Sequence, residues 1–442
     1  MEFHASIPLI TFSRGLLVLL GLMLVIRRRN DLFNLRNFHI KDLNFGLTSN
    51  KFLRLGLLLY FLLLLVADMV LLPADTAEAL KAIFVVVAEQ YVLVWLLTLI
   101  LDTREKLLSA LKVLVITSAV TALLCVLGCI LDVNFFHFLN TVEREMLMTT
   151  YYRLGVLRAE AGFGHPVFYG AFCVIMVPIN MYFVENSTGR KQKLFYSGCL
   201  TMTLVGLVLS NSRGSLLAFC CLVLLAAVLS IVQKRFKYFL RTYLPIGFSA
   251  LGVLLVIALL LPAGIAYLLG IVDSLLDTVF PNNRLLDEAI QNTVSGSDAP
   301  VPEYGENAAG TRSRLVQLTG ILWTLARKPI FGFGSNAHMR GLIRFRFSNG
   351  EWWPTKTFDI AIVSIICQYG IVGFVGFVSL YGSLLKTMLS KKHRKDPLMG
   401  FLALSFVTYL LCLLSISSLP KMAWVLIATI VCLVNIREKE ER

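Results

Sequence analysis

Residues 194–233 read LFYSGCLTMTLVGLVLSNSRGSLLAFCCLVLLAAVLSIVQ, an apolar run that a single arginine, Arg213, interrupts. A membrane-spanning helix needs about 20 apolar residues, so the run is long enough for two such helices. A bare arginine at the centre of a bilayer would cost about 2.5 kcal/mol or more. We therefore divide the run at Arg213 and predict two spans, 194–211 and 214–233, joined by a short corner.

The shortage of charged residues extends along the whole chain. Of its 442 residues, 57% are hydrophobic and 15% are charged, whereas about 25% of the residues in a soluble domain are charged. This composition predicts an all-α polytopic membrane protein that forms one integral membrane domain over residues 1–442. We expect about eleven spans. The expected spans are 5–26, 52–73, 81–101, 107–131, 164–184, 194–211, 214–233, 242–270, 357–385, 397–418 and 420–436.

Basic residues gather in alternate segments between these spans. Six segments together hold 24 Lys or Arg and nine Asp or Glu, namely 27–54, 102–106, 185–193, 234–241, 386–396 and 437–442. With the division at Arg213 all six fall on one side of the membrane, which the positive-inside rule makes cytoplasmic. The N-terminus is then external and the C-terminus internal. The net charge of +14 reflects this topology, so no nucleic-acid partner is expected.

The outer side carries mainly arginine at its basic positions. Two external loops hold most of this charge, a medium loop at 132–163 and a long loop at 271–356. A guanidinium is a planar fork that binds phosphate or carboxylate through two hydrogen bonds, which lysine cannot do. The pattern therefore indicates anion binding at the outer face. The arginines are Arg144, Arg153, Arg158, Arg213, Arg284, Arg312, Arg314, Arg327, Arg340, Arg344 and Arg346.

Two of these arginines stand beside expected helix ends. Arg213 at the corner either reaches lipid headgroups or binds an anion in a cavity, and the residues leave both open. Arg158 precedes Gly164 and Pro166, which predict a helix entry whose N-terminal N–H groups can bind an anion. We interpret His165 first as a cap or packed polar residue, with proton transfer left open.

The long loop contains a short amphipathic segment. Residues 314–326 have apolar side chains at helical spacing, and Pro329 ends the pattern. The segment is too short to span, so we expect an interfacial helix. Arg312 and Arg314 stand at its N-terminal end, where the helix dipole disfavours a cation unless an anion is bound. Binding to anionic lipid headgroups is the simpler alternative.

One acid and a few further side chains complete the candidate set. Asp359 opens the expected span 357–385 at the outer side. It is either a dipole-stabilised helix-start residue or a carboxylate that orients or deprotonates a substrate. The adjacent Trp352 and Trp353 either stack on sugar or belong to the interfacial aromatic belt. All nine cysteines fall in apolar runs without ligand spacing, so neither a disulfide framework nor a metal site is expected, and no cofactor is implied.

Four segments together resemble the O-antigen ligase and O-antigen polymerase family, over roughly residues 150–385. They are Arg158 through Gly170, Ser212-Arg213-Gly214, Arg314 followed by Pro329-Ile-Phe-Gly332-Phe-Gly334, and Asp359 followed by Gln368-Tyr369-Gly370-Ile-Val-Gly373. The sequence departs from the family at two places. Leu318 stands where the family has a tryptophan, and Asp359 stands where ligases have a histidine. Polymerase-type members often carry an aspartate there, so the second departure favours a polymerase.

The resemblance implies a GT-C-like membrane glycosyltransferase in the bacterial inner membrane. It would take a glycan from undecaprenyl diphosphate at the outer, periplasmic face and move it to an acceptor hydroxyl with inversion and without a metal. Arg158, Arg213, Arg312 and Arg314 would bind the diphosphate. Asp359 would act on the acceptor, with His165 and His338 as weaker candidates. Partners would be the lipid-linked donor, a glycan or lipid acceptor, membrane lipid and a chain-length regulator.

Three functions compete at this point. The first is a polymerase of O-antigen, capsule or exopolysaccharide, and the second is a ligase that uses lipid A core as the acceptor. A transporter or flippase for the same lipid-linked sugar is the alternative from another class. It would predict charges inside many spans and an internal repeat. Among the acidic residues, Glu89 and Asp68 are those in the interior of the expected spans, and no repeat is evident, so we favour the polymerase.

Overall fold

The structure is a computed structural model that describes part of the chain. The described residues are 12–27, 45–71, 76–136, 152–153, 156–261, 264–279, 316–335, 337–338, 340–346, 350–355, 358–416 and 420–441. Residues 280–315 of the long external loop expected at 271–356 lie outside them.

Long apolar helices dominate the described residues, as expected of a polytopic membrane protein. Within them, eight helices are long and apolar enough to cross a membrane. Three further apolar helices are shorter, at Arg14–Ile26, Gly264–Asp273 and Pro397–Cys412. The helical membrane fold is therefore confirmed, while the expected total of eleven spans stays a prediction.

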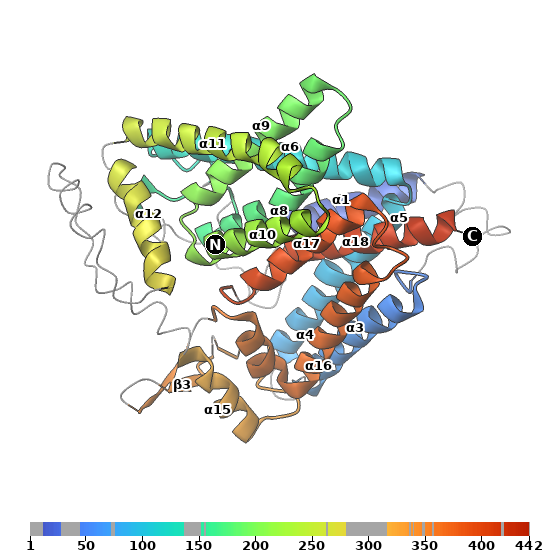
Figure 1. The fold of residues 1–442 in the computed structure, drawn as a ribbon. Helices are drawn as coiled ribbons and strands as arrows, with labels where there is room; N and C mark the ends of the chain where they lie inside the picture. Colours follow the sequence, from blue (N-terminus) through green and yellow to red (C-terminus); the bar gives the residue numbers. More distant parts are fainter. Residues whose placement is uncertain are drawn as a thin grey trace. The chain divides into compact units, whose positions relative to one another are not determined.

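The described residues fall into two compact units. The first comprises residues 1–110, 315–403 and 417–442, and the second comprises 111–314 and 404–416. The helices in chain order, drawn in Figure 1, are α1 (Phe12–Arg27), α3 (Lys51–Leu71), α4 (Thr76–Phe84), η2 (Val85–Val92), α5 (Leu93–Ile100), α6 (Arg104–Leu131), α8 (Pro166–Glu185), α9 (Arg190–Leu209), α10 (Arg213–Val232), α11 (Phe236–Leu260), α12 (Gly264–Val279), α15 (Thr319–Arg327), α16 (Ala361–Leu389), α17 (Pro397–Cys412) and α18 (Pro420–Glu440). Two antiparallel hairpins accompany them, β1 (Tyr152–Arg153) with β2 (Val156–Leu157), and β3 (Arg344–Arg346) with β4 (Trp352–Pro354).

Helix α8 is the buried centre of the second unit. Its side chains are apolar on every side and almost all are buried, which is typical of a helix enclosed by others. It packs against α9 and α10, and α11 and α12 pack in turn on α9 and α10. Few polar groups enter this core, and one of them is Ser405, whose hydroxyl donates to the Ile175 carbonyl at 2.9 Å. The packing holds the ends of α8, α9 and α10 in fixed positions.

The expected span 242–270 is wrong, because this stretch forms two helices. α11 begins at Phe236 and ends at Leu260, and α12 begins at Gly264. Leu261 has extended backbone angles, φ −101° and ψ 137°. Proline disfavours helical angles in the residue before it and has no N–H for the helix ladder, so Pro262 accounts for the end of α11.

In the first unit, α16 packs along α3 and is broken at Gly370. Gly370 has φ 63° and ψ −153°, a combination that side-chain-bearing residues avoid. The chain at 329–334 fills the break with main-chain hydrogen bonds. The N–H groups of Phe333 and Gly334 donate to the carbonyls of Cys367 and Gln368 at 3.0 and 2.8 Å. The broken ladder is thus satisfied by another segment, as a membrane interior requires.

Candidate active site

The corner around Arg213 has the form that the charge argument predicts. α9 ends at Leu209, α10 begins at Arg213, and the connecting residues Ser210, Asn211 and Ser212 are buried. Asn211 has φ 46°, a left-handed conformation that asparagine tolerates better than most residues. The division of the 194–233 run into two helices is confirmed.

A glycine of α8 makes room for this corner. A Cβ atom at Gly170 would lie 2.5 Å from the Ser210 hydroxyl, 3.0 Å from the Ser215 hydroxyl and 3.1 Å from the Ser212 Cβ. Because only glycine permits that approach, the Gly170 segment and the Arg213 segment fit together. Two stretches of the family pattern, far apart in sequence, therefore build one local structure.

Arg158 binds the C-terminal end of α9. Its Nε donates to the Ser210 carbonyl at 3.1 Å and its Nη2 to the Asn211 carbonyl at 3.2 Å. The neighbouring Ala159 N–H donates to the Leu209 carbonyl at 3.0 Å. Such carbonyls have no partner within their own helix, and a cation at this end also suits the helix dipole. Arg158 thus has a structural contribution that the sequence did not reveal.

Arg158 and Arg213 are close enough to repel each other. Burial lowers the pKa of Arg158, Tyr267 opposes that effect, and the charge of Arg213 lowers the pKa again. Arginine stays protonated in proteins even so. Arg213 is also the first residue of α10, where the positive end of the helix dipole adds to the field. The corner therefore concentrates positive charge that a bound anion would stabilise.

His165 caps α8. Its Nδ1 accepts a hydrogen bond from the Val167 N–H at 3.1 Å, and its backbone is extended, with φ −158° and ψ 133°. Pro166 follows as the first helical residue, a position that proline favours because its missing N–H is not needed there. The cap interpretation is confirmed, and proton transfer by His165 stays a prediction.

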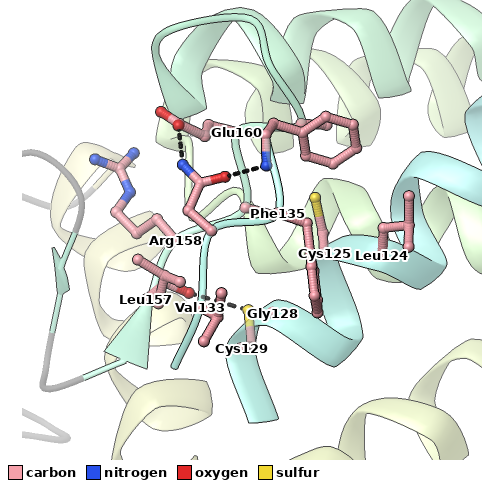
Figure 2. A pocket seen from close by; sticks show the side chains of 13 residues that line it. Leu124, Cys125, Gly128, Cys129, Val133, Phe135, Leu157, Arg158 and Glu160 are labelled. Atoms are coloured by element: carbon pink, nitrogen blue, oxygen red, sulfur yellow. Dashed lines mark hydrogen bonds between the residues drawn. The ribbon is translucent and has the colours of Figure 1, made fainter. Parts of the chain in front are cut away.

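A pocket lies between the end of α6 and the segment that carries Arg158 (Figure 2). Its polar lining comes from Asn134, Arg158 and Glu160, and thiols of α6 face it from the apolar side. Glu160 is almost fully buried and accepts a hydrogen bond from the Asn134 side-chain amide. Sequence reasoning assigned Glu160 no role, although an acid two residues after a site arginine was a usable signal.

In the first unit, Asp359 is fastened to a side chain that sequence reasoning did not select. The Gln317 side-chain Nε2 donates to the Asp359 Oδ2 at 2.9 Å. In return, the Asp359 backbone N–H donates to the Gln317 Oε1 at 2.9 Å. Gln317 is buried while Asp359 is half-buried. The carboxylate is therefore fixed in orientation and still partly accessible.

His338 contacts the segment that carries Asp359. Its ring packs on the ring of Phe358, the residue before Asp359, with 4.9 Å between centroids. Burial lowers the pKa of His338, which favours the neutral ring. A neutral imidazole can act as a base, so its candidacy stands as a prediction.

Trp352 and Trp353 do not form one patch. Neighbouring residues of a strand point to opposite faces. Trp352 packs on Trp323 of α15, with ring centroids 5.1 Å apart, whereas Trp353 is 55% exposed. The Arg327 guanidinium lies 3.3 Å from the centre of the Trp323 ring, a cation–π contact. Trp323 thus joins α15 to the β3–β4 hairpin, which lies beside α15 in Figure 1.

Comparison with known proteins gives one match. Residues 198–378 match the family described as O-antigen ligase. The resemblance to the O-antigen ligase and polymerase family is confirmed. Nothing among curated proteins or among solved structures matches the chain.

The matched residues include three of the predicted site residues, Arg213, Arg314 and Asp359. Arg158 and His165 lie before the matched residues. The hydrogen bonds of Arg158 to the Ser210 and Asn211 carbonyls join its segment to the Arg213 corner. Arg312 and Arg314 lie outside the described residues, so their roles stay predictions. The family indicates a glycosyltransferase-like membrane enzyme of lipopolysaccharide biosynthesis that acts on lipid-linked sugar.

Proposed function

We propose that the protein is a polymerase of cell-surface polysaccharide that joins lipid-linked repeat units at the outer face of the bacterial inner membrane. Two neighbouring positive charges carry the proposal, together with the family match. They belong to Arg158 and to Arg213, the first residue of α10. A lipid diphosphate is the anion that we expect these arginines to bind, because a lipid-linked sugar donor stays at the membrane surface. Arginine forks bind its oxygens bidentately.

The reaction needs charge stabilisation more than covalent help. The bond between the anomeric carbon of the glycan and the diphosphate oxygen breaks, and the acceptor hydroxyl oxygen forms a new bond to that carbon with inversion. The diphosphate leaves with its electron pair. Arg158, Arg213, Arg312 and Arg314 stabilise the negative charge that grows on it. No metal is needed for a leaving group that arginines stabilise.

Asp359 acts at the acceptor. Its carboxylate accepts the hydrogen bond of the acceptor hydroxyl, orients the oxygen and takes its proton as the new bond forms. The fixed orientation that Gln317 gives the carboxylate supports this assignment. In a polymerase the acceptor hydroxyl belongs to the sugar of another lipid-linked unit.

A ligase is the second candidate, because the matched family is described as O-antigen ligase. It would use the same donor and the same arginines but a lipid A core sugar as acceptor. The aspartate at 359, in place of the histidine typical of ligases, favours the polymerase. The two functions differ in which intermediate accumulates when the enzyme fails.

The test is complementation of a polymerase-deficient strain with Arg213→Ala at matched expression. Arg190→Ala is the control, because Arg190 is an exposed arginine at the other end of α9. We expect Arg213→Ala to accumulate single lipid-linked repeat units and to lose long surface chains, with Arg190→Ala unchanged. Arg213→Lys is expected to recover little, since lysine lacks the bidentate fork.

Two results would count against the proposal. Long lipid-linked chains that never reach an acceptor would favour the ligase. Normal chain lengths in Arg213→Ala would show that the Arg213 corner does not bind the donor's diphosphate. The outer arginines would then be contacts to lipid headgroups.

A further inference from the structure

A buried amide and a half-buried carboxylate make a two-point contact between Gln317 and Asp359. Gln317 lies two residues before α15, and Asp359 lies two residues before α16. The amide donates to the carboxylate and accepts from the same residue's backbone N–H, both at 2.9 Å. Two contacts to one residue fix both its side chain and its backbone, which a single hydrogen bond would not do.

The orientation of the Gln317 amide follows from these partners. Reversing the amide would place its oxygen against the Asp359 carboxylate and its NH₂ against a backbone N–H. Both contacts would then be repulsive, so only one orientation satisfies both partners. Gln317 is 4% exposed, and a buried polar group that lost its partner would be costly. The pairing is therefore a stable feature of the first unit.

The surrounding packing holds Gln317 in place. On the next turn, Gly320 of α15 lies against Phe345 of β3, where an added Cβ would come within 2.7 Å of the ring. Phe345 in turn packs on Phe358 within one buried apolar cluster. Helix, hairpin and carboxylate are thus parts of one rigid arrangement around the Gln317–Asp359 contact.

We propose that Gln317 is a positioning residue for Asp359, on the premise of the transferase function proposed above. Its N–H holds Oδ2 and stabilises the ionised carboxylate, while the carboxylate's partial exposure lets an acceptor hydroxyl reach it. Gln317 does not itself contact the acceptor. It determines the direction from which the acceptor hydroxyl is bound.

The experiment compares Gln317→Met with wild type in purified full-length protein, reconstituted in lipid nanodiscs with a lipid-linked repeat unit as substrate. Methionine is close in size and shape to glutamine but makes neither hydrogen bond. We expect kcat to fall by about 10-fold to 100-fold, as for a misplaced catalytic group, with KM for the donor nearly unchanged.

Gln317→Glu gives a second, independent readout. A glutamate there still accepts from the backbone N–H but places a second negative charge beside Asp359, so kcat should fall further than in Gln317→Met. Gln368→Met is the matched control. Among the described residues, the Gln368 amide donates within α16, to the Ser364 hydroxyl at 2.8 Å, so the kcat and KM of this variant should match wild type.

The outcomes separate this inference from the function on which it rests. If Asp359→Asn keeps full activity, the proposed role of Asp359 fails. If Asp359→Asn is inactive while Gln317→Met keeps wild-type kcat, only the positioning role fails. Equal losses of kcat in Gln317→Met and Gln368→Met would show a general loss of packing and would also overturn the inference.

Discussion

Gly170→Ala should damage the Arg213 corner without touching any charged residue. The new Cβ would lie 2.5, 3.0 and 3.1 Å from atoms of Ser210, Ser215 and Ser212. The corner serines are buried and packed, so the clash must be relieved by moving the connection that carries Arg213. Such overpacking typically costs about 1–3 kcal/mol. Alanine recovers about 1 kcal/mol through its better helix propensity, which leaves a net loss of up to about 2 kcal/mol.

Gly198→Ala is the matched control for this substitution. Gly198 lies inside α9 and an added Cβ there would meet no atom within 4 Å. It should therefore be neutral or gain up to about 1 kcal/mol. Thermal unfolding in one detergent and the chain-length ladder in cells are measured for both variants. We expect Gly170→Ala to melt lower and to make shorter chains. Equal stability and equal chain length in the two variants would refute the docking of α8 on the corner.

Three further predictions concern the first unit. Gly370→Ala should lose about 2–4 kcal/mol of stability, since alanine would adopt a positive φ and come within 2.4 Å of the Ile330 carbonyl oxygen; unchanged thermal unfolding would contradict the broken-helix geometry. Asp68→Asn should melt at the same temperature or higher, because Asp68 is fully buried and its carboxylate oxygens have no hydrogen-bond partner among the described residues; a clear fall in melting temperature would show a stabilising role for the charge. Burial alone would raise the pKa of Asp396, but the hydrogen bonds and charge of Arg104 lower it overall. Arg104→Ala should therefore reduce the free energy of unfolding by about 1–3 kcal/mol at pH 7.

The pH dependence of that last variant follows from the sign of the shift. A carboxyl group with a lowered pKa in the folded state contributes stability above its unfolded value of about 3.9. The contribution is lost as the pH falls through the folded-state value. The difference between Arg104→Ala and wild type should therefore be largest near neutral pH and shrink below about pH 4. A difference independent of pH, followed by thermal unfolding, would show that Arg104 stabilises through packing alone.

Features with a large local energy cost could be predicted from the sequence. An arginine inside an apolar run is expensive in a bilayer, and that cost alone divided α9 from α10 at Arg213. A proline after a polar residue predicted the start of α8 and the cap by His165. Pro262 carried a comparable signal for the end of α11, which the unbroken apolar run to residue 270 concealed.

Pairings between distant segments could not be predicted in the same way. Gln317 and Asp359 are 42 residues apart, and neither spacing nor composition indicates their contact. The break at Gly370 depends on another stretch of chain filling it, and a glycine in an apolar helix has several meanings. Arg158 illustrates the same limit, because its chemistry suggested an anion ligand while its carbonyl contacts at the end of α9 are visible only in the structure.

The most direct test of the polymerase assignment uses the purified protein in nanodiscs with a single defined substrate, an undecaprenyl-diphosphate-linked repeat unit. The measurement is the length distribution of lipid-linked glycan after incubation, with Arg213→Ala as the inactive reference. We expect chains of several repeats and stoichiometric release of undecaprenyl diphosphate when no other acceptor is present. No extension from this substrate, with transfer appearing only after lipid A core is added, would contradict the polymerase and identify a ligase.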